Sequence, residues 1–235
     1  MKKRFVKDLV TYAPSQFLPA LTAFITTPIL TRLLAPAEYG YWAQAASVAA
    51  FLVALAATAI GSAALRFYPA YEANSNLNVF FATFAISVTV VVTVVAGLSI
   101  LVLFLLNELL PSWLVQLLPL VILIFVAQSI FTVFICVIRA QGRSGSFTVF
   151  QLLTSYGGLG VGLLLIAVVG FRVEGLLWGN LLALITTLPF LVFVATRRVG
   201  IHPRHFQLAD AIEIWQPAHV TINFCYAEPD ITSFA

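Results

Sequence analysis

The chain has 235 residues, of which 61% are hydrophobic and only 9% are charged, and its mean hydropathy is +1.03. A soluble domain carries about a quarter charged residues, so this chain could not cover a surface that faces water. The net charge of +3 does not indicate nucleic-acid binding, because the basic residues lie at the ends of apolar runs and form no cluster. The composition predicts an all-α integral membrane protein without a nucleic-acid partner.

Six apolar segments are long enough to cross a membrane as helices, which requires about 20 residues each. The first is too long for the apolar core of a secretory signal, so we expect it to be a membrane helix. Polar turns separate the segments, including one from Arg66 to Asn78 and one from Arg139 to Ser146. A bundle of six transmembrane helices is therefore predicted within residues 1–200, over residues 9–34, 40–66, 78–106, 113–138, 147–170 and 175–196.

The first two segments meet in a short polar stretch that contains Pro36 and Gly40 as breakers. Tyr39, Tyr41 and Trp42 stand where the second apolar run begins. Such amphipathic rings suit a membrane–water boundary, with the apolar body inward and the polar tip outward. The stretch predicts a hairpin between two membrane helices.

Basic residues predict the orientation, because cytoplasmic loops carry an excess of lysine and arginine. If the N-terminus is cytoplasmic, only Arg32 and Arg172 lie outside. The other ten basic residues are then inside: Lys2, Lys3, Arg4, Lys7, Arg66, Arg139, Arg143, Arg197, Arg198 and Arg204. We therefore expect both termini to be cytoplasmic.

Polar residues recur at three- and four-residue steps along most of the segments, so they share a helix face. Because polar groups are costly in hydrocarbon, these stripes are expected to point inward, toward protein or a water-filled cavity. Either interhelical hydrogen bonding or a hydrated translocation path accounts for them. The candidate polar path consists of Gln16, Gln44, Gln128, Gln151 and Asn180. The accompanying stripe residues include Ser47, Thr58, Ser62, Thr132, Cys136, Ser155 and Thr187.

Glycines 158 and 162 lie four apart in the fifth segment, a spacing that lets two membrane helices approach closely. A hinge is the alternative, since glycine weakens a helix locally. No catalytic motif such as G-x-S-x-G, H-E-x-x-H or a Walker loop is present. The cysteines and histidines lack metal-ligand spacing. We therefore expect no enzyme activity, no cofactor and no metal.

Residues 201–235 contain no run that could span a membrane. Leu208, Ala211, Ile212 and Trp215 share one helical face, which predicts a short amphipathic helix on the cytoplasmic surface. The tail loses apolar content and periodicity after about residue 216. A truncated or frameshifted end would produce this pattern, and an ordinary polar tail would look similar.

Three short patterns resemble those of polysaccharide and lipid-linked oligosaccharide flippases in the multidrug/oligosaccharidyl-lipid/polysaccharide exporter superfamily. They are Thr31-Arg32-Leu33-Leu34 followed by Pro36, Tyr39 and Gly40; residues 61–68, which end in Leu65-Arg66-Phe67-Tyr68; and Ile138-Arg139-Ala140-Gln141-Gly142-Arg143. The resemblance covers residues 5–200. It implies one lobe of a two-lobe fold that moves polyprenyl-pyrophosphate-linked oligosaccharides across the inner (plasma) membrane by alternating access.

The same resemblance makes Arg32, Arg66 and Arg139 the candidate substrate-binding residues, since a guanidinium can bind two phosphate oxygens at once. Anchoring of helix ends is the alternative for Arg66 and Arg139. The sequence resembles only the N-terminal half of the family, so we expect either a second copy or a missing C-terminal half as a partner, besides membrane lipids. The rival function is a membrane scaffold or assembly subunit without transport activity.

Overall fold

The structure is a computed structural model that describes residue 24 and residues 26–73, 77–106 and 111–197. All regular secondary structure in these ranges is helical, which confirms the predicted all-α class. A helix over residues 26–33 comes first. It is followed by α2 (Pro36–Ala73), α3 (Leu77–Leu106), α4 (Ser112–Ala140), α5 (Ser144–Leu164), a short π-helix η1 (Leu165–Val169) and α6 (Val173–Thr196).

Five helices in the described ranges are long and apolar enough to cross a membrane: α2, α3, α4, α5 together with η1, and α6. They correspond to the second to sixth predicted segments. Of the first predicted segment, residues 26–33 are helical, and most of the remainder lies outside the described residues. The predicted tail helix at residues 208–215 also lies outside them.

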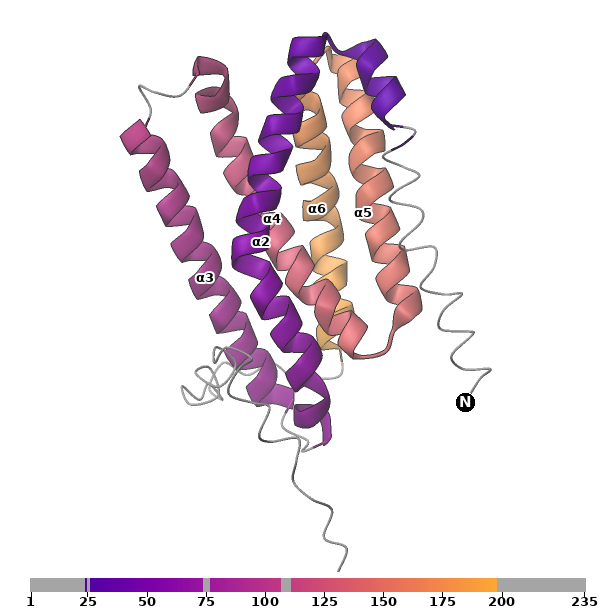
Figure 1. Cartoon of the computed structure of the whole chain (residues 1–235). Coiled ribbons are helices and arrows are strands. Elements are labelled where there is room, and N and C mark those ends of the chain that lie inside the picture. The colour runs from indigo at the N-terminus through magenta and orange to yellow at the C-terminus, as the bar shows by residue number, and fades with distance from the viewer. Residues whose placement is uncertain (1–23, 25, 74–76, 107–110, 198–235) are drawn as a thin grey trace, which may run out of the picture.

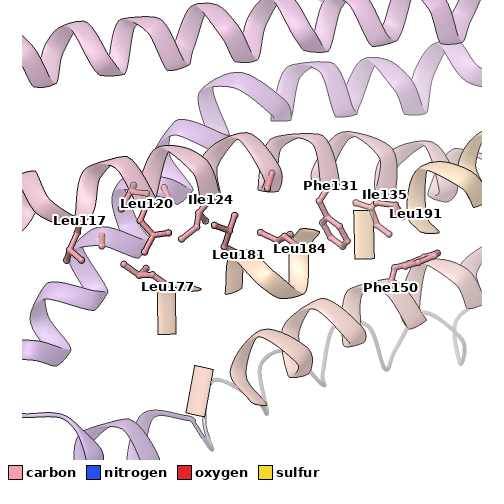
Figure 2. Close-up of a cluster of buried hydrophobic side chains, with 14 of the residues drawn as sticks. Leu117, Leu120, Ile124, Phe131, Ile135, Phe150, Leu177, Leu181, Leu184 and Leu191 are labelled. Carbon is pink, nitrogen blue, oxygen red and sulfur yellow. The ribbon is translucent and has the colours of Figure 1, made fainter. Parts of the chain in front are cut away.

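Helix α4 is the centre of the bundle and packs against α2, α3 and α6 (Figure 1). Figure 2 shows its apolar side chains meeting leucines of α6, and Phe150 of α5 completes the cluster. The contributing positions recur at steps of three, four or seven residues along both helices, so each helix offers one continuous face to the other. They are Leu117, Leu120, Ile124, Phe131 and Ile135 of α4 with Leu177, Leu181, Leu184 and Leu191 of α6.

Helix α2 packs on α4 through a face of small residues. Ala45, Ala49, Ala56, Ala57, Gly61 and Ala64 are all buried. Small side chains allow the helix backbones to approach closely, which is a main source of helix association in lipid. A Cβ atom at Gly61 would lie 3.0 Å from Sγ of Cys136 on α4, so a larger residue would require the Cys136 side chain to shift.

Two predicted boundaries of α2 are wrong. The predicted polar turn at residues 66–78 is helical as far as Ala73, with Pro69 inside the helix and Tyr68 fully buried. At 38 residues α2 is about 57 Å long, well beyond a hydrocarbon core of about 30 Å, so its polar last turns can extend past the lipid. At the other end the break is confined to Leu34 and Ala35, and Gly40 lies within the helix.

The start of α2 is fixed by its own sequence and by one distant contact. Pro36 occupies the first helical position, where its missing N–H costs nothing. The side chain of Glu38 reaches back to accept a hydrogen bond from the Ala35 N–H at 3.0 Å, as in one half of a capping box. Its other carboxylate oxygen pairs with Arg172, in the connection between η1 and α6. The ion pair thereby joins the turn between the 26–33 helix and α2 to the connection between η1 and α6.

Helices α5 and α6 pack through glycines on both sides. A Cβ atom at Gly158 would lie 3.3 Å from Cα of Asn180, and one at Gly162 would lie 3.2 Å from Cα of Leu176. On α6, Gly179 faces the backbone of Gly162 directly. The predicted close approach at Gly158 and Gly162 is confirmed. The partner pair, Gly175 and Gly179, has the same four-residue spacing.

Candidate functional site

A half-open polar cavity of about 260 Å³ lies between the 26–33 helix and α2, α4, α5 and α6. Three of the five residues of the predicted polar path, Gln128, Gln151 and Asn180, line it together. They come from three different helices. The structure therefore brings the α4, α5 and α6 stripes to one place, facing inward as their spacing predicts. The remaining lining residues are Thr26, Leu30, Trp42, Phe131, Thr154, Ser155, Gly158, Leu159 and Leu176.

Hydroxyl groups connect α5 and α6 beside this cavity. The Oγ1 atoms of Thr154 and Thr187 are 3.4 Å apart, and either hydroxyl can donate to the other. Each also lies within hydrogen-bonding distance of a carbonyl four residues earlier in its own helix, so one hydroxyl donates to the other helix while its partner donates to its own. Both side chains are buried. Thr154 is absent from the predicted path, although its position three residues after Gln151 puts it on the same helix face. That spacing is the signal that could have found it.

The 26–33 helix closes one side of the cavity through apolar contacts. Leu30 and Leu34 are buried against Leu176 of α6. Trp42, predicted to lie at the membrane boundary, is half-buried, lines the cavity and packs against the same cluster. The ring of Tyr41 stacks on Trp113 of α4 with the centroids 4.2 Å apart. Aromatic residues of the hairpin thus hold helices together at this end.

The polar stripe of α2 points the other way. Gln44, Ser47, Thr58, Ser62 and Arg66 are all exposed, on the face opposite the alanines that pack on α4. This stripe does not contact α4, because small residues, not polar ones, form that contact. Its expected position against protein or a water-filled cavity stays a prediction. Ser47 and Ser62 satisfy their hydroxyls by donating to carbonyls of their own helix, at 2.7 and 2.8 Å.

The three candidate arginines do not converge. Arg32 is exposed on the 26–33 helix, near the turn into α2. Arg66 and Arg139 are exposed toward the opposite end of the bundle, near the ends of α2 and α4 (Figure 1). The guanidinium carbons of Arg66 and Arg139 lie 5.7 and 5.9 Å from the ring centroids of Phe67 and Phe147, within reach of a cation–π contact.

The connection between α4 and α5 has a structural role. Arg143 donates to the carbonyl of Val194 at 2.9 Å, and the amide of Gln141 donates to that of Ala195 at the same distance. These carbonyls belong to the last turn of α6. Carbonyls in the last turn of a helix have no N–H partner within that helix. Of the remaining predicted residues, Gln16 lies outside the described ranges. Within those ranges, no group of three histidine, cysteine or acidic side chains could hold a metal ion.

A bundle of spanning helices with a polar cavity between them is a multi-pass membrane protein. Residues 5–216 match the model of a family described as polysaccharide biosynthesis protein. The chain belongs to this family, whose members are of the membrane exporter type. Membership indicates involvement in the export of polysaccharide precursors. No curated protein and no solved structure matches the chain.

Proposed function

We propose that the chain forms one lobe of a translocator that moves a polyprenyl-pyrophosphate-linked oligosaccharide across the membrane by alternating access. Family membership supports the class of cargo. The observation that carries the proposal is the exposed polar face of α2, which consists of Gln44, Ser47, Thr58, Ser62 and Arg66.

This face runs nearly the full thickness of a membrane. From Gln44 to Arg66 the helix rises about 33 Å, and the hydrocarbon core is about 30 Å thick. Phe51 and Leu55 interrupt the polar line near its middle. Polar groups facing hydrocarbon are costly, so such a face belongs against water or protein. A second bundle facing α2 across a hydrated path would meet that requirement, and alternating access needs two bundles around a central site.

The polar cavity is a poorer candidate for the path. No charged side chain lines it within the described ranges, whereas a pyrophosphate requires cations. Its amides and hydroxyls suit a few bound waters and hydrogen bonds between helices.

Arg32 and Arg66 are the cations proposed to meet the pyrophosphate, one toward each end of the path. Both are exposed, and a planar guanidinium can bind two phosphate oxygens in parallel. Arg139 is the third candidate, nearer the α4–α5 connection. Arg197, which follows the last turn of α6 and is also exposed, serves as the matched control.

The test is binding of a polyprenyl-pyrophosphate-linked oligosaccharide to the purified chain in lipid nanodiscs, followed by native mass spectrometry. Arg32→Ala should raise the dissociation constant about tenfold, the effect of losing one charged hydrogen-bond donor, and Arg197→Ala should leave it near the wild-type value. Arg32→Lys should recover only part of the loss, because lysine keeps the charge but lacks the planar guanidinium that can bind two phosphate oxygens at once.

Equal loss from the two alanine variants would remove Arg32 from the substrate site. Failure of the folded wild-type chain to bind the lipid-linked glycan, when it is retained by a positive-control flippase, would favour the membrane-scaffold function instead.

A further inference from the structure

A separate cavity of about 280 Å³ opens where α4 and α6 begin. Gln116, Leu117, Pro119, Leu120 and Leu123 of α4 line one side, and Glu174 and Trp178 of α6 line the other. It shares no lining residue with the polar cavity, nor with the polar face of α2. Its lining combines one carboxylate, one amide and one indole with three leucines.

The polar and apolar parts of this cavity lie at different depths. Glu174 and Gln116 stand within about 6 Å of the starts of their helices, measured along the helix axis. Leu123 lies about 16 Å further in than Ser112, the first residue of α4, by the same rise per residue. Both helices span the membrane. The cavity therefore has a polar rim near the headgroup level and leucines extending toward the hydrocarbon.

The charge at the rim is negative, and no ion pair among the described residues involves Glu174. The only ion pair in the described ranges joins Arg172 to Glu38, so the basic residue nearest to Glu174 in sequence is bound elsewhere. Residues lining the cavity include no lysine, arginine or histidine. Glu174 is exposed, and its carboxylate offers acceptors without donors.

Two further groups favour an ammonium ion at this rim. Trp178 lies four residues after Glu174, so the two side chains share a helix face, and indole is the best ring for a cation–π contact. Gln116, which also lines the cavity, adds the amide oxygen as a neutral acceptor for an ammonium N–H. A phosphate would instead face the like charge of the Glu174 carboxylate.

We propose that this cavity binds a phospholipid with a primary-amine headgroup, of the phosphatidylethanolamine type. The ammonium lies between the Glu174 carboxylate and the Trp178 ring, with the Gln116 amide as a further acceptor. One acyl chain runs along Leu117, Leu120 and Leu123. The site is independent of the proposed translocation path, because the two share no residue.

The test uses the full chain in nanodiscs made from equal amounts of phosphatidylethanolamine and phosphatidylglycerol with identical acyl chains. Native mass spectrometry after release from the nanodisc gives the ratio of the two lipids that remain bound. Wild type should retain the amine lipid about threefold or more over the anionic one, given the strength of a partly exposed cation–π contact together with a carboxylate partner. Glu174→Gln should bring the ratio close to one.

Glu72→Gln is the matched control, since Glu72 is an exposed glutamate near the end of α2, at the opposite end of the bundle. It should keep the wild-type ratio. Trp178→Leu preserves apolar bulk and should lower the ratio by a smaller factor than Glu174→Gln does. With phosphatidylcholine in place of the amine lipid, the preference should fall, because a trimethylated nitrogen has no N–H to donate.

Photocrosslinking provides a second measurement on the wild-type chain, with a photoreactive group attached to the glycerol backbone of the amine lipid. Crosslinks should concentrate on residues 116–123 and 174–178. An unchanged lipid ratio in folded Glu174→Gln, a wild-type preference for the anionic lipid, or crosslinks spread evenly over both ends of the bundle would each overturn the proposal. None of these outcomes bears on glycan binding by Arg32, so failure here is distinguishable from failure of the proposed function.

Discussion

Gly179 is the most tightly enclosed glycine in the described part of the chain. A Cβ atom there would lie 2.7 Å from the carbonyl oxygen of Gly158 and would overlap the backbone nitrogen and Cα of Gly162. Because the atoms in the way belong to the backbone, no side-chain rotation can relieve the clash. The contact between α5 and α6 depends on the absence of that one carbon.

Gly179→Ala should therefore destabilise the bundle by about 2–3 kcal/mol, the upper range for an overpacked core. Gly160→Ala is the matched control, since a Cβ atom at Gly160 meets no atom within 4 Å. The control should leave stability unchanged or raise it by about 1 kcal/mol at most, through helix propensity. Thermal unfolding of the purified variants in detergent measures both. Equal midpoints would show that α5 and α6 separate at no cost.

Single polar residues were partly predictable. Gln128, Gln151 and Asn180 follow stripes on different helices and meet in one cavity. Gln44 follows an equally regular stripe and faces away from the bundle. The stripe of Gln44 has the same spacing as the others. Its helix differs in that alanines and Gly61 on the opposite face allow a close approach to α4, so that face is the buried one.

At the scale of elements, the N-terminus of α2 depends on Glu38. One of its carboxylate oxygens accepts the Ala35 N–H, and the other pairs with Arg172. The capping bond is local and follows from a glutamate at the third helical position. The ion pair joins residues 134 apart in sequence, and nothing in the sequence pattern predicts it.

Glu38→Ala should loosen this corner more than Arg172→Gln does, because only Glu38→Ala removes both the cap and the ion pair. Arg172→Gln removes the ion pair alone. We expect a small loss of stability for each, below that of Gly179→Ala, since Arg172 is largely exposed and surface pairs contribute little. Hydrogen exchange of residues 34–38 measures the loosening. Equal exchange in the two variants would show that the cap adds nothing.

The C-terminal end of α2 shows that proline and polar residues do not always mark where a helix ends. Arg66, Pro69 and the polar residues beyond them predicted a turn, yet the helix continues to Ala73. Tyr68 is buried against Phe80 of α3, with the ring centroids 5.7 Å apart, and this packing holds the turn that contains Pro69. Tertiary contact overrides the local preference.

For the whole molecule, the charge bias predicts which end of the bundle faces the cytoplasm. Ala35, in the exposed turn before α2, and Arg197, after α6, lie toward opposite ends. Ten of the twelve basic residues fall on the side that carries Arg197 when the N-terminus is cytoplasmic. Orientation is therefore predicted with Ala35 outside and Arg197 inside.

Cysteine labelling in a variant that lacks Cys136 and Cys225 tests this orientation. A cysteine at position 35 should react with an impermeant maleimide from outside intact cells, and one at position 197 only after permeabilisation. The reverse pattern would invert the topology and sink the assignment of both termini to the cytoplasm.

The sequence by itself determined the class of protein, the positions of the five spans that the structure describes and most of the breaks between them. Lipid as solvent makes this possible, because a spanning helix must be about 20 residues long and predominantly apolar, and both properties can be read locally. It also gave the inward faces of α5 and α6, where glycines and polar residues coincide.

Only the tertiary structure decided which face of α2 is buried, that α4 is the centre, and that Glu174 and Trp178 share a cavity with leucines of α4. The reason is that hydrocarbon is as apolar as leucine, so hydrophobicity cannot distinguish a lipid-facing side from a protein-facing one. That choice rests on the fit of small residues between helices far apart in sequence, and the fit exists only once the bundle has formed.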